Sequence, residues 1–235
     1  MRFYGALFGV DHTTRPGRRV SLLWALALLG LALTWRPDMA SAQAQNEENI
    51  DFLWAFVALV DTGSAKKQLS ITQDVTLKTG DQLKMSVEPR KPCFVYVIYH
   101  GSQGEVRQLF PYTPQQFTTD YQPAKKYDIP PGDAWFRLDD QVGRETFYLL
   151  ASAQRLSELE TLLENYTAAP AAEQSQLATN IVAEIRDMRR RQRQLATPAE
   201  RPVPIAGNMR EDAQALEIKA TNFYSKTFTI EHEHR

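Results

Sequence analysis

The stretch that decides the fold is "KPCFVYVIYHGSQGEVRQLFP" (Lys91 to Pro111), which holds the uninterrupted apolar run "CFVYVIY". In a β-strand, successive side chains point to opposite faces of the sheet. Residues 93, 95 and 97 therefore share one face, and residues 94, 96 and 98 share the other. Apolar side chains on both faces predict a strand that is covered on both sides. The glycines of "HGSQGEV" then turn the chain into a return strand, which ends at Pro111 because proline cannot donate a hydrogen bond to a ladder.

The same stretch contains the only cysteine of the chain, Cys93, and one of its four histidines, His100. Their odd separation of seven residues places them on opposite faces of a strand, roughly 23 Å apart at about 3.3 Å per residue. A nucleophile and its base must be in hydrogen-bond contact. We therefore expect Cys93 to be a small buried hydrophobic residue, and we expect no catalytic pair here.

Two segments precede this strand. The run "IDFLWAFVALV" (Ile50 to Val60) is apolar on both alternating faces and is compatible with a buried strand or a short helix. The next segment, "VTLKTGDQLKMSV" (Val75 to Val87), alternates before and after "KTGD". Gly80 can adopt a positive φ, so this pattern predicts a hairpin with one buried face.

After the return strand, the sequence predicts a proline-rich loop over 112–133 and two further strands, "AWFRL" and "ETFYLLAS". Helical periodicity follows over 153–197, broken at Pro170, which predicts an antiparallel helical hairpin. Residues 198–220 have the composition of a proline-rich linker. Residues 221–235 alternate as a C-terminal strand with one wet face, on a sheet edge where Lys226 discourages further pairing.

The N-terminal residues 1–42 have the layout of a signal peptide. The basic "RPGRR" precedes the apolar run Val20–Trp35, and "ASA" ends at Ala42. Cleavage near Ala42 is favoured over a retained anchor because the run is shorter than the roughly 20 residues that cross a bilayer. Export of the unfolded chain is favoured over the twin-arginine route, and the expected location is periplasmic or secreted. The β-rich module would then cover residues 43–152.

Charge and motifs exclude several function classes. Removing the five basic and two acidic residues of segment 1–42 from the chain's 27 and 28 leaves a net charge of −4. Nucleic-acid proteins are usually strongly basic, so no nucleic-acid partner is expected. No phosphate-binding glycine loop or nucleophile elbow occurs in the sequence. The end "EHEHR" offers His232 and His234, but a closed zinc site needs four ligands, so we expect no metal and no cofactor.

Two surfaces are candidates for partner contact. The long loop carries four aromatic residues, which would either form a binding surface or fold back to cap the sandwich: Tyr112, Phe117, Tyr121 and Tyr127. The second helix ends in arginines, namely Arg189, Arg190, Arg191 and Arg193. Some arginines of this end should pair with Glu158 and Glu160 on the first helix, and the rest should overhang. A solvated face is favoured there over a docking patch for an acidic partner or a phospholipid surface.

The middle of the chain resembles the bacterial family called domain of unknown function 4384 (DUF4384). The matching features occur in the family's order: "LKTGDQLKMSVEP", "CFVYVIYHGSQGEVRQLFP", "YDIPPGD" and "GRETFYLLAS". They extend over residues 77–166. The chain departs from the family at Pro92-Cys93-Phe94, where tyrosine is usual, and in the loop "YTPQQFTTDYQ", which is asparagine-rich in the family. The resemblance implies a small β-rich accessory module and transfers no catalytic residues.

Together these patterns predict an α+β fold: an antiparallel β-sandwich-like module with an appended antiparallel helical hairpin and a returning C-terminal strand. The favoured function is an exported, non-catalytic interaction module of the bacterial envelope that binds another envelope protein. Membrane contact is expected only at the periphery or through an uncleaved signal. The alternative is a hydrolase or other enzyme, which would need convergent polar groups in one cleft.

Overall fold

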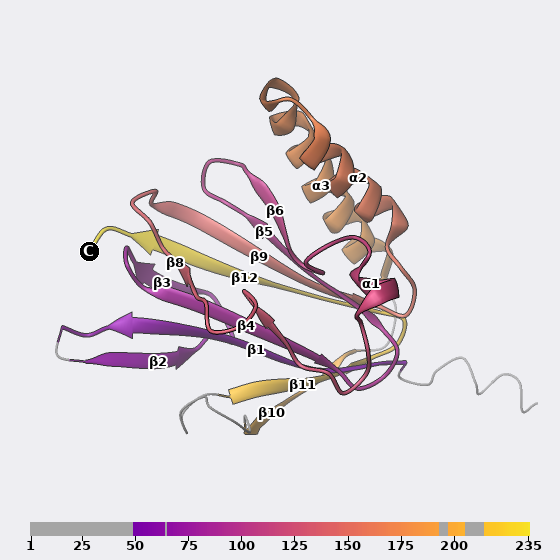
Figure 1. Cartoon of the computed structure of the whole chain (residues 1–235), viewed down its shortest axis with the longest axis horizontal. Coiled ribbons are helices and arrows are strands. Elements are labelled where there is room, and N and C mark those ends of the chain that lie inside the picture. Colours follow the sequence, from indigo (N-terminus) through magenta and orange to yellow (C-terminus); the bar gives the residue numbers. More distant parts are fainter. Residues whose placement is uncertain (1–48, 64, 193–196, 205–213) are drawn as a thin grey trace, which may run out of the picture. The chain divides into compact units, whose positions relative to one another are not determined.

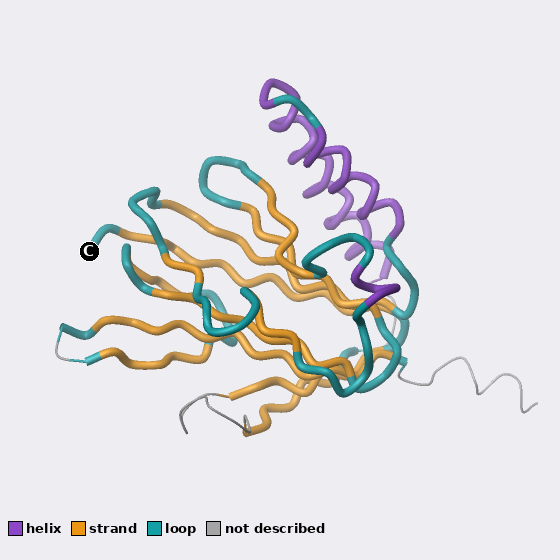
Figure 2. Tube along the Cα trace, in the orientation of Figure 1, coloured by secondary structure: helices purple, strands orange, loops and turns teal. Residues whose placement is uncertain are grey.

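A computed structural model describes residues 49–63, 65–192, 197–204 and 214–235, all within one structural unit, Asn46–Arg235. In this unit two mostly antiparallel sheets pack face to face, and two helices cover the outer face of one sheet (Figure 1). Figure 2 shows the strands in orange and the helical pair in purple. The α+β sandwich-like fold expected from the sequence is confirmed. The signal segment 1–42 lies outside the described residues.

The first sheet has the strand order β10-β11-β1-β4-β7, with β2 paired to β1 and β8 paired to β4. Its strands are β1 (Ile50–Asp61), β2 (Lys66–Ser70), β4 (Gln82–Pro89), β7 (Tyr127–Ile129), β8 (Phe136–Arg137), β10 (Ala199–Pro204) and β11 (Gln214–Ala220). The run that was compatible with a strand or a helix is thus the strand β1. It lies between β11 and β4, and its side chains are buried on both faces over Ala55–Ala58.

The second sheet has the order β3-β12-β9-β5-β6. Its strands are β3 (Val75–Lys78), β5 (Phe94–His100), β6 (Val106–Phe110), β9 (Gly143–Ser152) and β12 (Phe223–Glu233). As predicted, β5 is covered on both faces. Val95 and Val97 belong to the core between the sheets, whereas Tyr96 and Ile98 pack under the helices.

Aromatic side chains from both sheets fill the core between them. Trp54 of β1 stacks on Phe228 of β12 with ring centroids 5.9 Å apart, and Phe56 meets Phe147 of β9 edge-on at 5.1 Å. Cys93 lies in this core at 1% exposure. Burial raises the pKa of its thiol to about 11. Cys93 therefore sits in the fold as a core residue whose thiol stays protonated near neutral pH.

The helical hairpin consists of α2 (Ser157–Ala168) and α3 (Ala171–Gln192), joined across Pro170 as predicted; a short helix, α1 (Gln116–Thr119), lies in the long loop. The apolar stripes of α2 and α3 pack on the outer face of the second sheet, with Leu159, Ile181 and Ile185 fully buried. None of the helices in the described part of the chain combines the length and apolar composition required to span a bilayer.

The predicted hairpin around Gly80 is wrong, although the turn itself is present and Gly80 has φ +93°. The strand before it, β3, pairs in parallel with β12 in the second sheet. The strand after it, β4, pairs with β1 in the first sheet. Each strand has one face toward the shared core, so both alternate in the same way, and alternation cannot tell which sheet each strand joins.

Two further expectations need correction at the C-terminal end. The expected linker 198–220 contains β10 and β11, which pair antiparallel with each other. The prolines of β10 are compatible with a strand because β10 lies at the edge of its sheet. The C-terminal strand β12 is not an edge strand along its whole length: it pairs with β9 over ten residues and with β3 over Ile230–Glu233.

Candidate functional site

The four aromatic residues of the long loop do not share one exposed surface. The ring centroids of Phe117 and Tyr121 lie 4.9 Å apart, and Tyr121 stacks on Tyr127 at 5.5 Å. Tyr127 belongs to β7 and packs on Phe110 at 5.4 Å. Of the two alternatives, folding back onto the sandwich is the one that the structure shows for these three. Tyr127 is only 3% exposed, so its assignment as a contact residue is wrong, whereas Tyr112 is 38% exposed.

The arginines at the end of α3 bond to residues other than those expected. Arg189 donates a hydrogen bond to Oγ1 of Thr227 in β12 at 3.0 Å. Arg190 and Arg191 form ion pairs within α3, with Asp187 and Glu184 respectively. Arg193 lies outside the described residues.

The expected partner Glu160 is instead held at the start of α2. It accepts a hydrogen bond from the Tyr96 hydroxyl at 2.6 Å and pairs with Arg155 at 2.6 Å. The hairpin does bring Arg191 near Glu158, since both line one cavity beside the helices. The geometry of the hairpin was therefore predicted correctly. For the arginines that the structure describes, the predicted ion-pair partners were wrong, because Arg190 and Arg191 pair with acids on their own helix.

A groove of about 680 Å³ runs along the free edge of β6. β6 forms one wall, α2 forms the other, and the exposed Tyr112 is part of the lining. Its lining includes Val106, Leu163 and Tyr166 as well as polar side chains. The groove is therefore partly apolar, and one of its walls is a strand edge that no other strand of the described residues pairs with.

The backbone hydrogen bonds of β6 show which groups face this groove. Gly101 N–H donates to the Glu105 carbonyl at 2.9 Å, which makes these two residues a hydrogen-bonded pair of the β5–β6 hairpin. Hydrogen-bonded and non-bonded pairs alternate along an antiparallel ladder. Val106 N–H accordingly points away from β5, and it donates to the Tyr166 hydroxyl at 3.1 Å. By the same alternation, Arg107 faces β5, and Gln108 presents its N–H and C=O to the groove.

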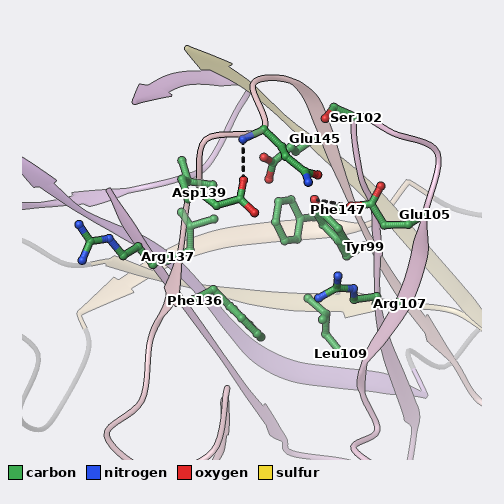
Figure 3. Close-up of a pocket in the computed structure, with 13 residues that line it drawn as sticks. Tyr99, Ser102, Glu105, Arg107, Leu109, Phe136, Arg137, Asp139, Glu145 and Phe147 are labelled. Atoms are coloured by element: carbon green, nitrogen blue, oxygen red, sulfur yellow. Dashed lines mark hydrogen bonds between the residues drawn. The ribbon is translucent and has the colours of Figure 1, made fainter. Parts of the chain in front are cut away.

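A second cavity, the end pocket, opens between the β5–β6 hairpin and the segment that connects β8 to β9, with a volume of about 210 Å³. Figure 3 shows the carboxylates of Asp139 and Glu105 on either side of the rings of Tyr99 and Phe147. Glu105 accepts a hydrogen bond from the Tyr99 hydroxyl at 3.4 Å. Titratable groups converge here, which is the arrangement that the enzymatic alternative required.

Glu145 lines the end pocket and is only 6% exposed. Its Oε1 lies 2.9 Å from Nδ1 of the buried His232, whose Nε2 lies 3.2 Å from the Thr79 hydroxyl. Burial raises the pKa of Glu145, and the hydrogen bond with His232 opposes that rise. His232 is thus buried in the fold, although it lies near the C-terminus. Among the described residues, no cluster of three or more His, Cys, Asp or Glu side chains is arranged to hold a metal ion.

Sequence reasoning missed both cavities. The groove exists because α2 packs beside β6, and the end pocket exists because Glu105 and Glu145, 40 residues apart in the sequence, meet at one end of the sandwich. One signal was present: "GEVRQ" places charged residues at 105 and 107, on one face of the return strand.

Comparison with known proteins gives one family. The family model described as "Domain of unknown function (DUF4384)" matches residues 76–155, in agreement with the resemblance noted over 77–166. The matched segment starts within β3 and ends just past β9, and it includes β5, β6 and all of the residues that line the end pocket. No curated protein and no solved structure matches the chain.

Proposed function

We propose that this chain, whose residues 76–155 belong to the DUF4384 family, is an exported, non-catalytic module of the bacterial envelope that binds another envelope protein. The signal-like segment 1–42 supports export. The module captures an extended segment of its partner along the edge of β6.

The observation that carries this proposal is the outward-facing backbone of β6 in a groove with a partly apolar wall. Peptides that add to a sheet edge gain affinity from main-chain hydrogen bonds and specificity from pockets for alternate side chains. Gln108 supplies the outward N–H and C=O. Leu163 and Tyr166 supply an apolar surface for side chains of the incoming strand.

The experiment uses the chain from Gln43 as bait for a display library of linear peptides and for envelope extract. Two variants are compared with it, Gln108→Pro and Gln108→Ala. Proline removes the outward N–H, whereas alanine keeps that N–H and removes only the side chain. We expect Gln108→Pro to weaken capture at least about tenfold, because it loses one hydrogen bond between uncharged groups and disturbs those beside it. We expect Gln108→Ala to bind almost as well as the natural chain does.

Circular dichroism of each variant establishes that it is folded. Equal capture by all three chains would contradict the proposal, because the groove backbone would then contribute nothing. Equal loss in both variants would assign the effect to the Gln108 side chain and would also contradict it.

A further inference from the structure

The end pocket contains opposite charges that do not neutralise each other. Glu105 Oε2 is buried and has no hydrogen-bond partner among the residues that the structure describes. The guanidinium of Arg107, which also lines the pocket, forms no hydrogen bond or ion pair with the residues that the structure describes. Glu105 and Arg107 are two positions apart in the sequence, so they lie on one face of the strand with Cα atoms about 6 to 7 Å apart. A buried carboxylate oxygen without a partner costs free energy, which a donor on a ligand would recover.

Glu145 adds a second acceptor that is already oriented. Its Oε1 is engaged by His232, and this leaves Oε2 for the pocket. Figure 3 shows Glu145 beside Asp139, at the end of the pocket opposite to Arg107. The pocket thus has Glu145 and Asp139 at one end, and Glu105 together with the guanidinium of Arg107 at the other.

The floor between these ends is apolar. It is formed by the rings of Phe136 and Phe147 and by the side chain of Leu109. A cavity of about 210 Å³ has the volume of about seven molecules of liquid water at roughly 30 Å³ each, and so fits a ligand of about six to nine non-hydrogen atoms. Small pockets of this composition orient a ligand with few polar groups and hold its body on apolar surface.

We propose that the end pocket binds a free α-amino acid with a small apolar side chain. The ammonium group lies between Glu105 and Glu145, the carboxylate lies on Arg107, and the side chain lies on the floor formed by Phe136, Phe147 and Leu109. This site is separate from the β6 groove, so it holds or fails independently of the proposed function.

The test is isothermal titration calorimetry of the chain from Gln43 with L-valine and L-leucine. Two analogues separate the charges: leucinamide lacks the carboxylate, and 4-methylpentanoate lacks the ammonium group. We expect binding of at least one amino acid and a loss of at least about tenfold for both analogues, because charge-assisted hydrogen bonds are the strong ones.

Three variants complete the test. Glu105→Gln and Arg107→Gln should each weaken binding at least about tenfold without unfolding the chain, since Arg107 is exposed and glutamine has the shape of glutamate. Arg137→Gln is the matched control, because Figure 3 shows Arg137 pointing away from the pocket. No heat from any apolar amino acid, or binding that survives both Glu105→Gln and Arg107→Gln, would overturn the proposal.

Discussion

β6 and β10 are both edge strands, but they differ in whether their outer side offers N–H donors to another strand. β10 carries Pro202 and Pro204 opposite Leu216 and Gln214 of β11. Proline has no N–H, so these positions offer no donor to another strand on the outer side. β6 has no proline within it, and its Gln108 faces a groove walled by α2. The edge of β10 is therefore protected against pairing, whereas the edge of β6 keeps its outward N–H groups and lies in a groove.

The largest expected effect tests the orientation of β6. Arg107→Pro should lower the free energy of unfolding by about 2 to 3 kcal/mol, because its N–H faces β5 and its loss leaves a ladder carbonyl without a donor. Gln108→Pro should lower it by about 1 kcal/mol or less, since that N–H faces the groove. Urea denaturation of both variants measures the difference. Equal losses would show that the alternation inferred from Gly101 and Val106 is wrong.

The next prediction removes the protection of β10. The double variant Pro202→Thr with Pro204→Thr restores two outward N–H groups and should make the chain self-associate as its concentration rises. Analytical ultracentrifugation over a concentration series measures this. Val203→Thr is the control, since its N–H faces β11 and no donor is added to the edge. A monomeric double variant would mean that the prolines do not protect this edge.

The smallest expected effect concerns Val106 N–H of β6, which donates a hydrogen bond to Tyr166 of α2. Tyr166→Phe removes the hydroxyl that accepts from Val106 N–H, and should cost about 1 kcal/mol of unfolding free energy. It should also expose a second donor in the groove. Thermal unfolding and amide exchange at Val106 check both expectations; an unchanged exchange rate would argue against this hydrogen bond.

Where local chemistry decides a structure, the sequence was sufficient to predict it. The apolar residues on both faces of Phe94–His100, the turn at Gly101 and the stop at Pro111 were enough for β5 and β6. The same holds for the helical break at Pro170, since proline cannot continue a helix without losing a hydrogen bond.

Where the structure of a segment depends on which strand it pairs with, the sequence was insufficient to predict it. The alternating strands around Gly80 join different sheets, although either pairing would bury the same face. The prolines of β10 are typical of a linker and also of an edge strand, and only the presence of β11 distinguishes the two. The groove and the end pocket depend on contacts between residues far apart in the chain, such as Val106 with Tyr166, and no local pattern records those contacts.

Backbone amide exchange in β6 tests the central claim most directly. It is measured by NMR on the chain from Gln43, free and with a peptide selected from the display library. We predict that the Arg107 amide is protected in both states, and that the Gln108 amide exchanges fast in the free chain and becomes protected when the peptide binds. Protection that appears elsewhere while Gln108 remains unprotected would contradict the claim that β6 is the binding edge.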